Sequence, residues 1–572
     1  MFRKNQKHQQ LEMFSTVQSL RDDQQKLLDG SWAGVFYREL FCRLDERPFA
    51  VLYSDEASRP NVPVNVLVGL EVLKAGFGWS DAEMYEAFTF NLQVRYALGY
   101  RDLSEGYLDI RTVYYFRQRL AEHMQKTGTN LLAQAFAQIT DAQIKAFAIK
   151  TGRLRMDSTF IASNICAMSR LHLLVEVLVR VDRMLTPADQ ARYAPDFAAY
   201  RKGSAQQYVY RVKGEDGAQH MQQIGDVMVR LLNELATTYK QDDTYQMLER
   251  VFHEHFIVET DSRLRLKQGT ELSAASLQSP DDPDASFRRK RGEEHTGYAV
   301  NVTETCDPKN PVQLVVQTQT QPNVVDDPTL LTNDLPALTE RFDVNELNTD
   351  GGYNNATTAA LLRAAEITHV QTALRGHAAT GLSRSAFMFE TGTDGVPTTV
   401  RCPQGQTTTF RQTGAAGYAA DFDATQCAVC PWVQCCPAKL RKRHPVRVLC
   451  VDVHDVEIAH RRQQIAQNKA AGHNLRVAIE STIGTLKHPY PDDQLPVRGL
   501  GRVTDMMLAC GLMLNVRRLW RYLTAKHDEE TATIQATKSS TESSDAVVSL
   551  SRFLSRLLSR VLGLDRRPAV AC

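Results

Sequence analysis

Residues 344–374 read VNELNTDGGYNNATTAALLRAAEITHVQTAL and hold two strand-like runs with a helical pattern between them. The first run ends at Asp350, two glycines follow, the helical pattern covers 354–366, and a second strand is expected at 368–374. Strands that alternate with helices indicate an α/β sheet, and functional side chains in such sheets gather where the strands end. Asp350 is therefore a candidate functional carboxylate, and the glycines let the backbone turn tightly beside it.

The same alternation extends toward the N-terminus. The elements expected there are, in chain order, a strand at 147–163, a helical insertion at 165–275, strands at 297–304 and 311–319, and a helix at 328–341. The first strand carries Asp157 in the run RLRMDSTFIAS, and the run SPDDPD at 279–284 indicates an acidic loop broken by proline. Each aspartate alone is a weak signal, because Asp-Ser-Thr and Asp-Gly-Gly are also common in turns and helix caps.

A third carboxylate lies in residues 473–487, HNLRVAIESTIGTLK. His473, Arg476, Glu480 and Lys487 are spaced by three, four and seven residues, which puts their side chains on one face of a single helix. A solvated face with an Arg–Glu pair one turn apart is the ordinary explanation of such a pattern. With two candidate aspartates elsewhere in the chain, the pattern instead favours a site for metal ions bound to a phosphodiester.

A strand aspartate, a strand-end aspartate and a helix glutamate in this order resemble the DDE transposases of bacterial insertion sequences. The similarity is to the branch with a Tyr-x2-Arg-x3-Glu-x6-Lys signature, which Arg476, Glu480 and Lys487 match, whereas His473 stands at the usual tyrosine. The run HTGYAVNVTET at 295–305 and the cysteine block at 402–436 also resemble this branch, and the similarity spans roughly residues 30–525.

This resemblance implies a ribonuclease-H-like α/β catalytic core with Asp157, Asp350 and Glu480 as the catalytic carboxylates. They would hold two divalent ions, Mg²⁺ or Mn²⁺, with Asp157 bridging both, Asp350 binding one and Glu480 the other. The implied reaction is metal-dependent cleavage of double-stranded DNA at the element ends and strand transfer into target DNA. Arg476 and Lys487 would contact terminal phosphates or a displaced base, and His473 would supply part of the tyrosine contact.

The cysteine block is the second candidate metal site. It holds Cys402, the Cys427-x2-Cys430 knuckle and the adjacent Cys435 and Cys436. Thiolates at this spacing suit tetrahedral zinc, and we expect Cys402, Cys427, Cys430 and Cys436 as structural ligands, with Cys435 as the substitute for the fourth. Buried or free thiols are the alternative.

Net charge and local charge bear on the nucleic-acid partner. The net charge of +1 argues against general coating of DNA, so phosphate contacts would have to come from local patches. Three basic runs are candidates, namely Arg288, Arg289, Lys290 and Arg291; Lys439, Arg441, Lys442 and Arg443; and Arg517, Arg518 and Arg521 with Trp520 among them. Each run could be a solvated face, as charge runs usually are, but three such runs in one chain, two of them near the proposed site in sequence, favour phosphate contact.

The N-terminal region, 1–145, has helical patterns throughout and is expected to be an all-α, DNA-binding domain. An apolar helix from Val64 ends at the glycines of 76–78, and Ser80 with Glu83 forms a capping box that starts the next helix. Two helices across such a turn suit a helix-turn-helix reader, and they suit an ordinary helical bundle equally well.

The domain layout expected from these patterns has five parts. They are the helical domain at 1–145, the first part of the catalytic core at 146–375, a cysteine-rich insertion at 376–446, the last part of the core at 447–525, and a C-terminal tail at 526–572. The tail combines a Ser/Thr-rich stretch at 529–549, expected to be a disordered linker, with a basic amphipathic helix.

Composition and termini add further expectations. The longest apolar run, 506–514, is too short to span a membrane, and no secretion signal is recognisable. We therefore expect a cytoplasmic, nucleoid-associated bacterial protein that acts as a homodimer on DNA. The alternatives are a ribonuclease-H-like, metal-dependent DNA nuclease (an endonuclease without strand transfer) and an inactive DNA-binding copy.

Overall fold

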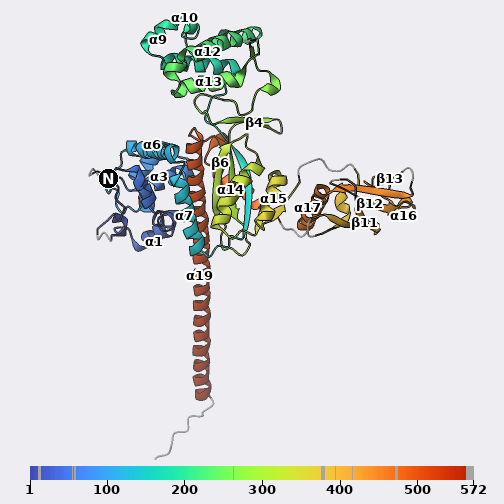
Figure 1. Ribbon diagram of the computed structural model, residues 1–572. Helices are drawn as coiled ribbons and strands as arrows, with labels where there is room; N and C mark the ends of the chain where they lie inside the picture. The colour runs from blue at the N-terminus through green and yellow to red at the C-terminus, as the bar shows by residue number, and fades with distance from the viewer. Residues whose placement is uncertain are drawn as a thin grey trace, which may run out of the picture.

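The structure is a computed structural model of the whole chain (Figure 1). It describes residues 1–561 apart from 11–13, 55, 57–59, 262, 375–380, 393–394, 415, 442–443 and 471–473, and it describes side chains as far as residue 533. Within these residues the chain is mixed α/β, with a helical N-terminal region.

The described residues of the N-terminal region form seven α-helices, besides short 3-10 and π segments. They are α1 (Asp22–Gly30), α2 (Trp32–Phe36), α3 (Val64–Phe77), α4 (Asp81–Phe90), α5 (Leu92–Ala97), α6 (Ile110–Thr127) and α7 (Leu131–Ala146). Gly78 ends α3 in the left-handed conformation at φ 70°, and Ser80 and Glu83 form the expected capping box at the start of α4. Most of α3 is buried, and α4 exposes Glu83 and Glu86 to solvent. This pair therefore fits the packing interpretation better than a helix-turn-helix reader of phosphates.

The central sheet has six strands. They are β1 (Arg153–Ala162), β4 (Ser286–Lys290), β5 (Glu293–Thr305), β6 (Val315–Pro322), β7 (Glu346–Thr349) and β8 (Thr368–Gln371). Their order is β4-β5-β1-β7-β8, with β6 also paired to β5. β1 is antiparallel to β5 and parallel to β7, and β7 is parallel to β8. An antiparallel half joined to a parallel half in this order fits a ribonuclease-H-like core.

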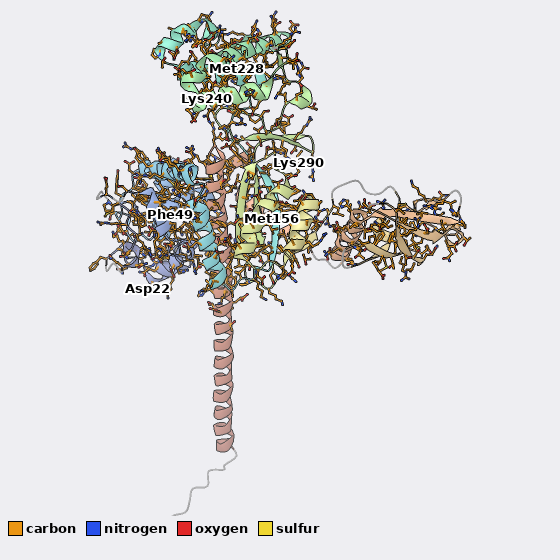
Figure 2. All side chains as sticks on the ribbon, in the orientation of Figure 1. Asp22, Phe49, Met156, Met228, Lys240 and Lys290 are labelled. Atoms are coloured by element: carbon orange, nitrogen blue, oxygen red, sulfur yellow. The ribbon has the colours of Figure 1, made fainter. Side chains whose placement is uncertain are left out.

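Helices cover both faces of this sheet (Figure 1). On one face, α14 (Asp327–Arg341) and α15 (Ala356–Ala364) bury a cluster that includes Leu154 and Met156 of β1, the latter labelled in Figure 2. On the other face, α7 and the first part of α19 (Leu500–Val561) pack on β6. Because side chains alternate along a strand, Arg155 and Asp157 point to this second face, away from Leu154 and Met156.

The insertion between β1 and β4 is a helical unit with its own core, which contains Met228 (Figures 1 and 2). Its elements are α8 (Arg170–Met184), α9 (Pro187–Arg192), α10 (Ala194–Phe197), α11 (Ala205–Arg211), α12 (Gly217–Tyr239), α13 (Asp243–His255) and the hairpin β2 (Phe256–Val258) and β3 (Leu264–Leu266). The hairpin corrects the all-helical expectation for 165–275. The SPDDPD loop after it is also more than an acidic connection, since Asp282 is buried and accepts hydrogen bonds from Tyr298, Ser163 and the backbone of Gly499.

A second six-stranded sheet interrupts the core after β8. It consists of β9 (Met388–Thr391), β10 (Pro397–Arg401), β11 (Thr407–Gln412), β12 (Gly417–Asp423), β13 (Lys439–Leu440) and β14 (Val446–Asp452), with α16 (Ala424–Ala428) and α17 (Val453–Ala470). β14 pairs with β12, and Val456 and Ala459 of α17 lie in the core of this unit. The boundary predicted at 446 is therefore wrong, because β14 and α17 complete the insertion and the chain returns to the main core only near residue 475.

Two helices close the core. α18 (Val477–Lys487) packs on β1 and α19, and α19 continues far beyond the core as a single helix (Figure 1). The disordered linker expected at 529–549 is wrong, because the structure has helix there. The side chains of the predicted amphipathic stretch after it lie outside the described residues. No helix in the described part of the chain is long and apolar enough to cross a membrane.

Candidate active site

Asp157 lies in the middle of the central sheet, on the face that α18 covers. It is buried on β1, its Oδ2 accepts a hydrogen bond from Nη2 of Arg476 at 2.6 Å, and its Oδ1 accepts one from the backbone of Ser158 at 3.0 Å. Burial raises the pKa of the Asp157 carboxyl, with a further contribution from the charge of Asp350, although Arg476 opposes the shift. Asp157 is therefore a carboxylate for which a nearby cation would be favourable.

Asp350 follows β7 directly and lies close enough to Asp157 for its charge to act on that carboxyl. Arg155 of β1 pairs with Asn348 of β7 in parallel register, so Asp157 and Asp350 occupy equivalent positions two residues further on. The Oδ1 of Asp350 accepts a hydrogen bond from the backbone of Gly352 at 2.7 Å, which fixes the carboxylate at the turn. A Cβ on Gly351 would meet the carbonyl oxygen of Ala373 at 2.2 Å, so the close approach of these two segments requires glycine.

Glu480 comes from the first turn of α18. Arg476, immediately before the helix, joins it to the sheet, because its Nη1 lies 3.3 Å from Glu480 Oε1 while its Nη2 contacts Asp157. The side chain of Glu480 is 60% exposed, in contrast to that of Asp157 at 11%. Burial lowers the pKa of Arg476, but the charges of Asp157, Asp350 and Glu480 outweigh it and raise the pKa overall. All three carboxylates thus lie within electrostatic reach of one guanidinium.

One cavity of about 570 Å³ contains all three carboxylates. Its other lining residues that were expected from the sequence are Lys290, Arg291 and Arg476. Those that sequence reasoning missed are Ser158, Thr159, Phe160, Glu293, His295 and Asp327. The cavity is therefore lined by carboxylates from β1, the end of β7 and α18, and by basic side chains from the β4–β5 hairpin.

Asp327 is a fourth carboxylate in this cavity. It is buried at the start of α14, and its Oδ1 accepts a hydrogen bond from the Ser158 hydroxyl at 2.7 Å. The only hint in the sequence was the Asp326-Asp327-Pro328 start of a helix, which indicates a cap and not a site. His295 was within a quoted motif, and its ring lies 4.8 Å from that of Phe160.

The basic residues at 288–291 divide into different environments. Lys290 and Arg291 line the cavity, and Nζ of Lys290 lies 5.0 Å from the Phe160 ring. Arg288 donates hydrogen bonds to the carbonyls of Asn323 and Val325, so its guanidinium supports the sheet edge. Arg289 is exposed on β4 and does not line the cavity. The hairpin turn itself is formed by Arg291 and Gly292, which both have positive φ.

The remaining residues that were predicted to contact DNA differ in where the structure places them. Nζ of Lys487 lies 3.2 Å from the hydroxyl of Thr159, which lines the cavity, and also pairs with Asp493. His473 lies outside the described residues, as do Lys442 and Arg443. In the third basic run, Arg517 donates to the carbonyl of Gly76, Arg518 to Glu304 and Trp520 to the carbonyl of Gly30, whereas Arg521 is exposed.

The predicted cysteine ligands come together in the second sheet unit. Cys402, Cys427, Cys430 and Cys436 line one small cavity of about 30 Å³, together with Trp432 and other residues. Cys435 is exposed and does not line it. Burial raises the pKa of the Cys427 and Cys436 thiols, and the neighbouring thiols of the group add to this shift. Cys435 is therefore poorly placed as a substitute ligand.

Neither group is arranged around a metal position in the structure. Over the described ranges, no set of three or more His, Cys, Asp or Glu side chains has a geometry that could hold a metal ion. At the carboxylates, the Arg476 guanidinium contacts both Asp157 and Glu480.

Two segments of the chain match transposase families. Residues 401–520 match a family model described as a transposase DDE domain, and residues 25–119 match one described as a transposase domain (DUF772). Comparison with curated proteins and with solved structures gave no match. Both family matches indicate a transposase; Glu480 lies inside the first, and Asp157 and Asp350 lie outside both.

Proposed function

We propose that the protein is a DNA transposase that binds the ends of an insertion sequence and cleaves and joins DNA at the cavity of Asp157, Asp350 and Glu480. The observation that carries this proposal is that three carboxylates from β1, the end of β7 and α18 line one cavity, although they are far apart in the sequence. The two transposase family matches support it independently. The branch with the Tyr-Arg-Glu-Lys signature remains part of the proposal.

The residues of the cavity fit divalent ions by their chemistry. Carboxylate oxygens are the ligands that Mg²⁺ and Mn²⁺ prefer, and burial of Asp157 beside Asp350 favours a cation there. We assign Asp157, Asp350 and Glu480 as the holding residues. When bound, two such ions supply Lewis acidity for an attacking water or 3′-hydroxyl and for the leaving oxygen. Arg476 then partly neutralises the charge of the carboxylates and can donate hydrogen bonds to a phosphate.

The basic residues that line the cavity support a role for this cavity in DNA binding. Lys290 and Arg291 line the same cavity as the carboxylates, and Lys487 contacts Thr159, another of its lining residues. Phosphate neutralisation by such side chains gives salt-dependent affinity without sequence preference. Arg289 and His473 remain proposed contacts, whereas Arg288 acts through the hairpin that carries Lys290. We further propose that the chain acts on both element ends as a homodimer.

We also propose that Cys402, Cys427, Cys430 and Cys436 hold a structural Zn²⁺. Four thiols around one cavity supply the number and type of donor that a closed tetrahedral site needs. Their mutual repulsion as thiolates is a reason for a cation among them. The site would join the β10–β11 turn to the α16 segment within the second sheet unit.

The experiment that tests the proposed function uses purified full-length protein with Mg²⁺. The substrates are DNA carrying the repeats that flank the gene and a supercoiled target plasmid. The proposal predicts nicks at the repeat ends and covalently joined products. Cleavage without joined products would replace it with the nuclease alternative, and binding without either would replace it with the inactive-copy alternative.

A further inference from the structure

A buried ionic cluster lies next to the proposed active site, on the same face of the central sheet. Its centre is Glu304 on β5, whose side chain is fully buried. Nε of Arg155 contacts Glu304 Oε1 at 2.6 Å, Nη1 of Arg518 contacts Oε2 at 2.6 Å, and the Thr482 hydroxyl lies about 3 Å from both oxygens. Arg518 also donates to the Thr482 hydroxyl. We call these four residues the Glu304 cluster: Arg155, Glu304, Thr482 and Arg518.

The Glu304 cluster connects the elements that carry the carboxylates. Arg155 and Glu304 are cross-strand partners of β1 and β5, and Arg155 lies two residues before Asp157 on the same face of the sheet. Thr482 lies on α18, two residues after Glu480. A third connection runs from Nη1 of Arg155 to the carbonyl oxygen of Leu475 at 2.8 Å. Since Leu475 precedes Arg476, the cluster holds α18 at its entry and again at its second turn.

Stability alone is a weak explanation for this arrangement. A buried ion pair contributes little net stability, because the free energy lost by removing both charges from water is about as large as the free energy gained from their attraction. The start of α18 also has no side-chain cap, so the contact of Arg155 with Leu475 and that of Arg476 with Asp157 fix the chain entering the helix. Arg476 and Glu480 lie between the two anchors, and an error of about 1 Å in such groups can lower a rate by two orders of magnitude.

We infer that Glu304 is a positioning residue that sets α18, and with it Glu480 and Arg476, against Asp157. Arg518 extends the effect to α19, which packs on the N-terminal helices. The inference rests on the proposed function for its catalytic meaning. Its structural part, that the Glu304 cluster holds α18 on the sheet, stands by itself.

The test uses Thr482→Val, which removes the hydroxyl with little change in shape and leaves both arginines paired with Glu304. Thr482→Ser is the rescuing variant. Thr485→Val is the matched control, because Thr485 is only partly buried on the same helix and its hydrogen bond goes to the carbonyl of Ser481, outside the Glu304 cluster. Glu304→Gln is the stronger variant. Hydrogen exchange of the α18 amides and cleavage of end DNA are measured on full-length protein, well below the unfolding temperature.

The inference predicts that Thr482→Val and Glu304→Gln speed exchange of α18 but not of α14, and slow cleavage by about tenfold or more. Thr482→Ser and Thr485→Val should behave like the parent. Unchanged α18 exchange in Thr482→Val, or faster exchange with parental cleavage, would overturn the inference. If the parent protein does not cleave, the exchange data still decide whether the cluster holds α18, and only the proposed function fails.

Discussion

At the residue scale, Arg476 organises the cavity. It contacts Asp157 and Glu480 at once, so it holds a strand carboxylate and a helix carboxylate near a third at Asp350. The sequence spacing gave the Arg476–Glu480 pair, because residues four apart on a helix are neighbours. It could not give the contact with Asp157, which depends on how α18 lies across β1. For the same reason Asp327 was missed, since its place in the cavity follows from the packing of α14.

Asp334 is a buried carboxyl whose charge should make stability depend on pH. Burial raises its pKa to about 7, while Asn301 donates a hydrogen bond to it at 2.7 Å. The folded state therefore favours the protonated form. Its contribution to stability is complete below the unfolded pKa, near 4, and is lost as pH rises toward 7, at no more than about 1.4 kcal/mol per pH unit.

The prediction for this residue is that Asp334→Asn flattens the pH dependence of the free energy of unfolding between pH 5 and 8. The variant should be more stable than the parent at pH 8, because it carries no charge to bury. Urea unfolding at several pH values measures this. A variant that is less stable than the parent at pH 8, with an unchanged slope, would contradict the assigned burial cost.

At the scale of single elements, the patterns for α3, α4, α14 and α15 were predicted well. Local signals such as the Ser80–Glu83 capping box decide where such helices begin. β4 was missed, because its Arg288–Lys290 run has no apolar alternation and forms a strand only through pairing with β5. α18 begins at Val477, so the predicted helix was too long at its start.

The proposed zinc site at the four cysteines can be tested directly by metal analysis of the purified protein. We expect purified protein to carry about one zinc per chain, and Cys427→Ser with Cys430→Ser to remove it and to destabilise the second sheet unit. Cys435→Ser is the control and should keep the zinc, because Cys435 is exposed and lies outside the cavity. Metal analysis of the three proteins tests this. Zinc loss in Cys435→Ser, or no zinc in the parent, would reject the assigned ligands.

At the scale of the whole molecule, the order of the units followed from the sequence but their limits did not. The alternation of strands and helices predicted an α/β sheet, whereas the ribonuclease-H-like core was implied by the resemblance to DDE transposases and the order of the strands was not predicted. The true end of the second insertion could not be predicted, since β14 belongs there only by pairing with β12, some thirty residues earlier. The extent of α19 was also unpredictable from a Ser/Thr-rich composition.

α19 allows a prediction about the whole chain. Its described buried side chains run from Val503 to Leu519, and the residues from 525 to 533 are exposed. A chain that ends at residue 533 should therefore unfold at the same temperature as the full chain, within about 2 °C. Calorimetry of both proteins measures the difference. A fall of 10 °C or more would mean that the later part of the helix supports the core.

The central claim is that Asp157, Asp350 and Glu480 form one metal-dependent site for DNA cleavage. Its most direct test is cleavage of DNA carrying the element ends by Asp157→Asn, Asp350→Asn and Glu480→Gln, with binding to the same DNA measured in parallel. Glu293→Gln, which changes a largely exposed carboxylate that lines the same cavity, is the control. We expect each of the three variants to lose Mg²⁺-dependent cleavage by about a thousandfold or more, which corresponds to roughly 4 kcal/mol of transition-state stabilisation, while DNA binding changes little. Cleavage at the parental rate by any one of the three would contradict the assignment of that carboxylate and with it the proposed site.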